Sequence, residues 1–309
     1  MGELAIRRLI LSVTALLGVV SVVFVLLHAS GDPVTLLVSQ DATREDMERI
    51  RRAYGLDQPL GVQYLRYLAR VARGDLGYSF RQGLPVAELI VERLRATFEL
   101  ALAGLAVAVG TGVTLGLVAA ARRGSLWDTA AMTAALVGTS VPSFWLGLLL
   151  IIAFGVHLGW LPISGYGSLA HLLMPAVVLG GFYGAQISRL TRASLLEVLA
   201  QDYVRTARAK GLSSRAVLVR HGLRNALLPI LTVLGMDFGR MLGGAVIVES
   251  IFAWPGMGRL AVQAVLARDF PVVQGVTIVG AAVFLTVNFV IDLLYGWVDP
   301  RLRATTARA

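Results

Sequence analysis

Five long stretches of this chain contain no charged residue, and they constrain its fold more than any other feature. The runs are 17 to 28 residues long and cover 9–27, 100–121, 129–156, 172–188 and 272–291. An α-helix needs roughly 20 such residues to cross the hydrocarbon layer of a membrane. Charged residues make up only 15% of the chain, against about 25% in an ordinary soluble domain. The chain is therefore predicted to be an all-α, polytopic membrane protein.

A sixth span is predicted at 228–250, because residues 226–248 are apolar except for Asp237 and Arg240. Asp237 and Arg240 are three residues apart, so they share one face of a helix and can pair. Charges inside a membrane usually face a bundle interior or a water-filled path. The two residues either line a substrate pathway or merely pair at a kinked or wet helix end. Six transmembrane helices are thus expected, at 9–29, 97–121, 129–155, 171–190, 228–250 and 272–294.

The first span has a basic start that is also typical of a secretory signal peptide. Arg7 and Arg8 precede its uncharged run of 19 residues. The apolar core of a signal peptide is shorter, roughly 7–15 residues. The residues that end the run, Leu26 to Ser30, also form a poor small-x-small cleavage site. We therefore expect an uncleaved transmembrane helix.

The net charge of +9 is distributed unevenly between the two sides of these spans. With the N-terminus inside, the outer segments 30–95 and 249–271 carry a total of +1. The cytoplasmic segments carry +10, and they are 1–8, 122–128, 189–225 and 299–309. Because basic residues gather in cytoplasmic loops, both termini are predicted to lie in the cytoplasm. No long soluble basic domain exists that would favour nucleic-acid binding instead.

Several kinds of chemistry are excluded or disfavoured by missing residues. The chain has no cysteine, which excludes disulfides, thiolate metal sites and cysteine nucleophiles. Its single lysine, Lys210, lies between Ala209 and Gly211 and does not fit the phosphate-binding P-loop pattern. No histidine lies in His-Glu-x-x-His, and neither Ser140 nor Ser143 lies in Gly-x-Ser-x-Gly. We expect no enzyme, no catalytic residue and no metal site, and any ATP that drives the protein must bind another subunit.

Prolines interrupt two of the predicted spans. Pro142 lies in the third span and Pro175 lies early in the fourth. Each removes a helix hydrogen bond, and broken helices in transporters lie near the transport path. A simple packing kink explains either proline equally well. The candidates for the substrate pathway are therefore Asp237, Arg240, Ser140 and Pro142.

The cytoplasmic segment 189–229 is too long to be a simple connection between helices. Gly211 would divide it into two short surface helices, and Ser213 or Ser214 could cap the second one. From charge alone, the simplest interpretation is a basic amphipathic hairpin that binds anionic lipid. The residue string within the segment favours a different interpretation.

Residues 202–212 (DYVRTARAKGL) and 220–229 (RHGLRNALLP) closely resemble the EAA loop of ABC importer permeases. Ala207 and Gly211 match the general pattern Glu-Ala-Ala-x3-Gly, whereas Arg205 and Thr206 replace Glu and Ala. The chain resembles, nearly end to end, the DppB/OppB-like first permease of the dipeptide/oligopeptide/nickel subgroup. Further matching motifs are Gly31-Asp-Pro33, Gly55-Leu-Asp-Gln-Pro59, Gly74-Asp-Leu-Gly77, Ser140-Val-Pro-Ser-Phe-Trp-Leu-Gly147, Glu249-Ser-Ile-Phe-Ala-Trp-Pro-Gly256, Arg268-Asp-Phe-Pro271 and Asp299-Pro-Arg301.

This resemblance implies the MetI-like fold of type I ABC importer permeases and a place in the prokaryotic cytoplasmic (inner) membrane. The chain and a second, DppC/OppC-like permease would form the path for di- or oligopeptides. One or two ABC ATPase subunits would bind ATP and Mg, and an extracytoplasmic substrate-binding protein would deliver the substrate. The chain itself would hold no cofactor. Import of nickel or another small solute stays open, as do a stand-alone secondary transporter and a passive lipid-binding scaffold.

The resemblance also implies roles for individual residues. The residues expected to contact the ATPase are Arg205, Thr206, Ala207, Gly211 and Leu212. Those expected at an external gate, or in contact with the binding protein, are Trp254, Pro255 and Gly256, although a plain interfacial tryptophan anchor is the alternative for Trp254. The expected domains are a first helix with the N-terminus (1–29), an extracytoplasmic loop with short helices (30–95), a five-helix permease domain (96–295) that contains the coupling loop 189–229, and a cytoplasmic tail (296–309).

Overall fold

The computed structural model describes residues 2–29, 43–45, 48, 52 and 57–298. Its regular structure in this part of the chain is helical, apart from one isolated bridge between Tyr78 and Pro85. The chain divides into two compact units. Unit 1 comprises residues 1–95 and 259–309, and unit 2 comprises residues 96–258. The predicted tail lies almost entirely outside the described residues.

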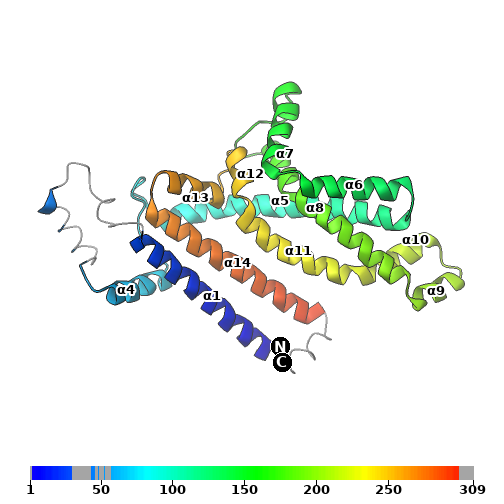
Figure 1. The fold of residues 1–309 in the computed structure, drawn as a ribbon, viewed down its shortest axis with the longest axis horizontal. Coiled ribbons are helices and arrows are strands. Elements are labelled where there is room, and N and C mark those ends of the chain that lie inside the picture. The colour runs from blue at the N-terminus through cyan, green and yellow to red at the C-terminus, as the bar shows by residue number, and fades with distance from the viewer. Residues whose placement is uncertain (1, 30–42, 46–47, 49–51, 53–56, 299–309) are drawn as a thin grey trace. The chain divides into compact units, whose positions relative to one another are not determined.

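Unit 1 is built around the first and last long helices. α1 (Gly2–Ala29) and α14 (Phe270–Val298) lie side by side in Figure 1. They run antiparallel, because Arg8 near the start of α1 is 3.0 Å from Asp292 near the end of α14. The start of the first span and the end of the last span therefore lie on the same side, as the charge distribution predicts.

The described part of the outer segment is attached to unit 1 at two places. α4 (Leu60–Ala72) packs against α1, where the hydroxyls of Tyr64 and Ser21 are 2.6 Å apart. Further along, the carboxylate of Asp269 accepts hydrogen bonds from the Ser79 hydroxyl and the Phe80 amide. Asp269 directly precedes α14, so it fastens the outer turn that begins at Ser79 to the base of the last span.

Unit 2 contains the remaining long helices, packed through small residues. Its elements are α5 from residue 96 onward (Val86–Ala121 in full), α6 (Leu126–Ser140), α7 (Ser143–Leu150), the π-helical segment η1 (Ile151–His157), α8 (Leu169–Leu199), α9 (Asp202–Ala209), α10 (Ser214–Ala216), the π-helical segment η2 (Val217–Leu223), α11 (Arg224–Gly244) and α12 (Val246–Ile251). α13 (Met257–Leu266) begins at the boundary of the two units. A Cβ atom on Gly112 of α5 would lie only 2.7 Å from Cβ of Ile187 in α8. Such close approach through small residues is typical of helices packed in membranes.

The described helices confirm the prediction of an all-α membrane protein with six spans, once one bent pair is counted as a span. Five helices are long and apolar enough to cross a membrane: Ile6–Leu26, Val86–Ala121, Leu169–Leu199, Ser214–Gly243 and Phe270–Leu293. The sixth is the pair formed by Leu126–Ser140 and Ser143–His157, which is bent by 104°.

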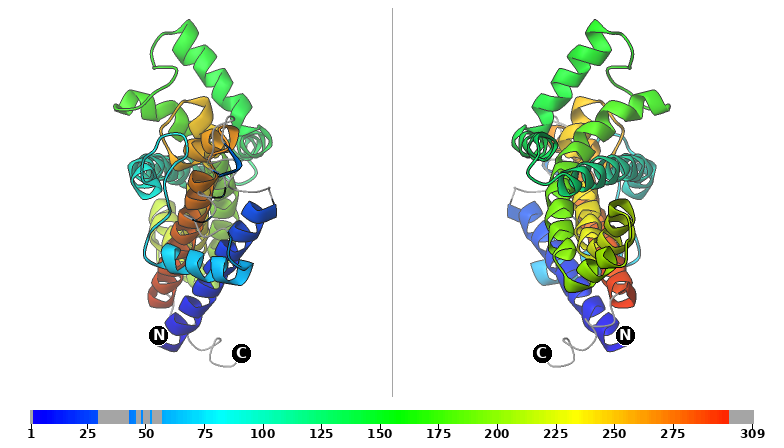
Figure 2. Two further views of the ribbon diagram at one scale, coloured as in Figure 1. Left: turned by 90° about the vertical axis from the view of Figure 1, so that its left-hand side faces the viewer. Right: turned by 90° about the vertical axis from the view of Figure 1, so that its right-hand side faces the viewer.

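The third span therefore differs from the single helix predicted over 129–155. α6 ends at Ser140, and Val141 adopts an extended conformation (φ −78°, ψ 123°) before Pro142. A proline disfavours helical geometry in the residue before it and has no amide hydrogen to donate. The hydroxyl of Ser140 donates to the carbonyl oxygen of Leu136 at 2.9 Å, which satisfies one acceptor at the broken end. Figures 1 and 2 show α7 turning steeply away from α6.

Candidate functional site

The segment predicted to contact an ATPase is a short helix held between the ends of two long ones. α9 connects α8, which has 31 residues, to the continuous helix Ser214–Gly243, which has 30. At 1.5 Å per residue both are about 45 Å long, against roughly 30 Å for the hydrocarbon layer. About ten residues of each helix are thus free to extend beyond the membrane, and α9 lies at their tips.

The two faces of α9 have different surroundings. Val204 and Ala207 are buried in a small apolar cluster with Val217 of η2, beside Leu199 of α8. The other six residues of α9 are exposed, including Arg205 and Thr206. Ala207 therefore fastens α9 to its own chain and does not share the outer surface with Arg205 and Thr206, although the sequence pattern placed all three in one contact.

Gly211 ends α9 in a conformation that few other residues adopt. Its φ is +80°, in the left-handed region, where glycine has no Cβ to hinder it. Its amide donates to the carbonyl oxygen of Arg208 at 2.9 Å, and the amide of Leu212 donates to that of Ala207. This is a common way for a helix to stop. A Cβ on Gly211 would meet no atom within 4 Å, so the glycine also leaves the outer surface flat.

Of the two short surface helices predicted within 189–229, only the first exists as a separate helix. Residues up to Leu199 extend α8, and the helix from Ser214 continues without interruption into the fifth span. Ala226 and Ile230 are fully buried against Leu195 of α8 in one cluster. This packing joins the segment from Ser214 to the fifth span, across the boundary expected at residue 228. The local sequence indicates only where the helix begins, because the Ser213 hydroxyl accepts a hydrogen bond from the amide of Ala216.

An ion pair that was not predicted joins the cytoplasmic ends of two helices near α9. Arg192 of α8 donates from Nε and Nη2 to the two carboxylate oxygens of Asp128 in α6, at 2.6 and 2.8 Å. The amide of Gly124 donates to the same carboxylate at 3.0 Å. The Ser125-x-x-Asp128 spacing is a helix-start signal, but it does not identify an arginine 64 residues away. The pair fixes the start of α6 to α8.

The charged residues of the fifth span pair as predicted. Arg240 Nη1 lies 3.2 Å from Asp237 Oδ1. The side chain of Asp237 is fully buried, whereas that of Arg240 is 59% exposed. The guanidinium group is thus bound to Asp237 through Nη1, while most of the arginine side chain stays exposed.

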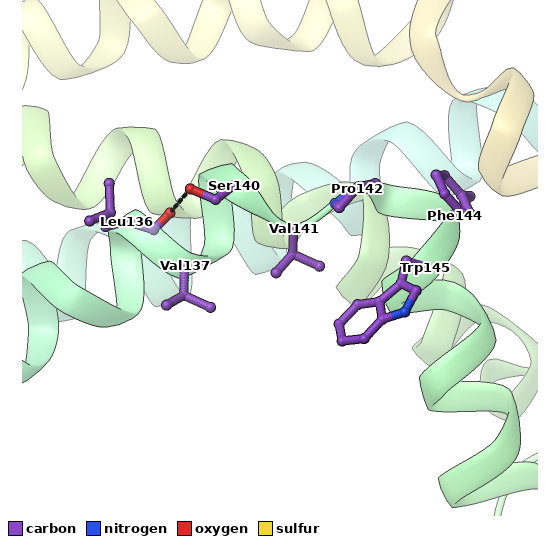
Figure 3. Close-up of a pocket in the computed structure, with 7 residues that line it drawn as sticks. All are labelled: Leu136, Val137, Ser140, Val141, Pro142, Phe144 and Trp145. Atoms are coloured by element: carbon purple, nitrogen blue, oxygen red, sulfur yellow. Dashed lines mark hydrogen bonds between the residues drawn. The ribbon is translucent and has the colours of Figure 1, made fainter.

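The bend between α6 and α7 brings Ser140 and Pro142 to an apolar surface. Figure 3 shows the hydroxyl of Ser140 bonded back to its own helix, and Trp145 beyond the break. The pocket at this bend is lined by Leu136, Val137, Ser140, Val141, Pro142, Phe144 and Trp145. The structure therefore places Ser140 and Pro142 at the same pocket, whereas Asp237 and Arg240 are not among its lining residues. The polar side-chain groups of the lining residues are the Ser140 hydroxyl and the indole N–H of Trp145.

The predicted gate residues form a buried turn after α12. Trp254 is only 2% exposed, and its indole N–H donates to the carbonyl oxygen of Ala96 at 2.8 Å. An interfacial tryptophan would present its ring to lipid headgroups, so this burial contradicts the simple anchor interpretation. The ring of Tyr166 packs edge-on against it, with centroids 4.8 Å apart. Pro255, next in the chain, is partly exposed.

Gly256 contacts a buried carboxylate that the sequence patterns did not identify as functional. Glu249 is fully buried and accepts a hydrogen bond from the hydroxyl of Thr97 at 2.8 Å. That hydroxyl oxygen also accepts the amide of Met257, at 2.8 Å. A Cβ on Gly256 would collide with the Glu249 carboxylate. Glu249 therefore ties the turn to α5, and only a glycine fits beside it.

Comparisons with known proteins match nearly the whole chain. The family model of binding-protein-dependent transport system inner membrane components matches residues 112–304, and the corresponding N-terminal model matches residues 1–101. The glutathione transport system permease protein GsiC of Escherichia coli O6:H1 is 42% identical, with 96% of this chain and 98% of that protein covered. The dipeptide transport system permease protein DppB of Escherichia coli K12 is 39% identical, with 98% and 99% covered.

The fold also matches a solved transporter. The MetNI methionine ABC transporter in an inward-facing conformation aligns with a TM-score of 0.55 at 17% identity, over 68% of this chain and 96% of that one. Identity at this level shows the fold alone, which is the MetI-type fold predicted. The chain belongs to the family of binding-protein-dependent transport system inner membrane components, the permease subunits of ABC importers.

Proposed function

We propose that this permease imports di- or oligopeptides together with a second, DppC/OppC-like permease. The observation that carries the proposal is the 39% identity to a dipeptide permease over nearly the full length of both chains. The likeness to a glutathione permease supports the same class, because glutathione is itself a short peptide. An extracytoplasmic binding protein delivers the peptide, and partner ATPases bind ATP and Mg.

α9 is the contact through which those ATPases act. Arg205 and Thr206 offer exposed groups on its outer face, and Leu212 is 41% exposed just beyond it. The inner face, with Val204 and Ala207, transmits force because it is packed against the long helices. A displacement of α9 therefore moves α8 and the helix from Ser214 together.

The ion pair between Asp128 and Arg192 extends this motion to α6. α6 ends at the bend before Pro142, so its far end can change its angle to α7 without straining a continuous helix.

At the other end of unit 2, the turn from Trp254 to Gly256 belongs to the external gate. Its indole hydrogen bond and the buried carboxylate of Glu249 keep that gate rigid.

The substrate class is tested with the complete transporter in proteoliposomes that contain ATP. We expect ATP-dependent uptake of a labelled dipeptide when the binding protein is present. Vesicles that contain only this chain should show none. Uptake of nickel without uptake of peptide would replace the peptide proposal, and uptake by the chain alone would indicate a secondary transporter.

The coupling role of α9 is tested by adding bulk to its outer surface. Gly211→Gln should abolish uptake, because the side chain projects where the ATPase docks. Gly124→Gln is the matched control, since Gly124 also has a left-handed φ (+77°) and open space around it but lies in the turn between α5 and α6. Both variants carry the same backbone strain and should insert equally well. Normal uptake by Gly211→Gln would refute the coupling role.

A further inference from the structure

The exposed side of α11 carries one charge on an otherwise uncharged strip. Met236, Arg240 and Gly243 follow one another at spacings of four and three residues, so they share one face of α11. All three are exposed, and a Cβ on Gly243 would meet no atom within 4 Å. The guanidinium group of Arg240 therefore stands on an apolar surface with space beside it.

The hydrogen bonds of this arginine leave most of its donors unused. A guanidinium group has five N–H donors, and Arg240 makes one hydrogen bond, to Asp237, among the residues that the structure describes. The second oxygen of Asp237, Oδ2, is buried without a partner in the same part of the chain. Asp237 therefore binds Arg240 through one oxygen, and the remaining N–H donors of Arg240 can bind an anion.

An exposed arginine within a span must face something other than lipid tails. A charged side chain in contact with hydrocarbon is costly, and such residues face a bundle interior or a water-filled cavity. The neighbouring Met236 lowers the local polarity, which strengthens any ion pair formed there. The strip on α11 is thus suited to an anionic group that passes through water.

We propose that Arg240 binds the terminal carboxylate of the peptide during translocation, and that Asp237 is its positioning residue. This rests on the proposed function, because peptides are the substrates that carry this group. The planar guanidinium fits a carboxylate with two parallel hydrogen bonds. The charge of Asp237 already offsets part of the attraction, so the peptide carboxylate is held weakly enough to be released.

The test measures uptake of a free-acid dipeptide by the complete transporter in proteoliposomes. Arg240→Gln should lower the uptake efficiency by about tenfold or more, because a charged hydrogen-bonding partner is lost. Arg240→Lys keeps the charge and should recover part of the uptake. Leu231→Gln adds a polar group at another exposed position of α11 and is the control that should resemble the wild type. Replacement of Arg240 should reduce the uptake of the C-terminally amidated dipeptide much less than the uptake of the free acid.

Each other outcome overturns the inference. Wild-type uptake by Arg240→Gln would show that the guanidinium does not meet the substrate. Equal loss in the glutamine and lysine variants, or loss of co-purification with the second permease, would show that Arg240 packs against a partner subunit instead. A wild-type transporter that takes up no peptide would overturn the proposed function as well, which separates the two failures.

Discussion

Gly180 and Gly181 are neighbours in α8, yet the structure predicts opposite effects for the same substitution. A Cβ on Gly180 would collide with the carbonyl oxygen of Gly104 in α5 and lie 2.8 Å from Cβ of Val107. A Cβ on Gly181 would meet no atom within 4 Å. Gly180→Ala therefore requires α5 and α8 to move apart, whereas Gly181→Ala requires no movement.

The expected difference in stability follows from these distances. Ordinary contacts of a Cβ begin near 3.4 Å, so the two helices must separate by several tenths of an ångström or more, and overpacking of this kind costs about 1–3 kcal/mol. Gly181→Ala should instead gain up to about 1 kcal/mol, because alanine favours a helix more than glycine does. The two variants should thus differ by about 1–4 kcal/mol.

Thermal unfolding of the full chain in detergent measures this difference. About 2 °C of Tm per kcal/mol is expected for a chain of this size, so Gly180→Ala should unfold about 2–8 °C below Gly181→Ala. Uptake by the complete transporter should fall only for Gly180→Ala. Equal Tm values for the two variants would refute the close packing of α5 on α8.

Two other pairs of residues give comparable tests. Asp128→Ala should lower the Tm because Arg192 loses a partner that it binds through two hydrogen bonds, whereas Asp202→Ala removes an exposed carboxylate and should leave the Tm unchanged; equal effects would contradict the role of the pair. Tyr67→Phe should be neutral or stabilising, because its buried hydroxyl has no hydrogen bond among the described residues, whereas Tyr64→Phe should cost about 0.5–1.5 kcal/mol because its hydroxyl is bonded to a serine of α1. Burial raises the pKa of Tyr67 to about 12 from its ordinary 10.0, so the phenol ionises in the unfolded chain at a lower pH than in the folded protein. The free energy of unfolding is therefore unaffected by this group below pH 10.0 and falls as the pH rises to about 12. The Tm of Tyr67→Phe should fall less over this range than that of the wild type.

The spans and the coupling segment could be predicted from sequence because their signals are local. Membrane spans lack charged residues because a charged side chain in hydrocarbon raises the free energy. This free-energy cost is set by the type of each residue, so the spans can be recognised without knowing which residues are neighbours in space. The pairing of Asp237 with Arg240 was predictable for the same reason, since the two residues are one helical turn apart. The string that contains Gly211 identified the surface helix α9 in the same way.

Other features of the site depend on contacts between distant parts of the chain. Ala207 lies on the buried side of α9 because it packs in one apolar cluster with Val217, which belongs to a later helix. The partner of Asp128 is Arg192, and the carboxylate of Glu249 bonds to Thr97, 152 residues away. No pattern within a short window contains such pairs.

The uncharged runs and the string around Gly211 are enough to establish that this chain is a helical membrane protein, how many spans it has and where an ATPase is expected to act. They do not establish that the third span is interrupted at Pro142, because Pro175 also lacks an amide hydrogen and yet α8 continues through it. The bend of 104° in the third span and the start of the fifth span as early as Ser214 follow from the folded structure. Helix ends and bend angles are selected by packing against α8 and other neighbours, which the local sequence does not contain.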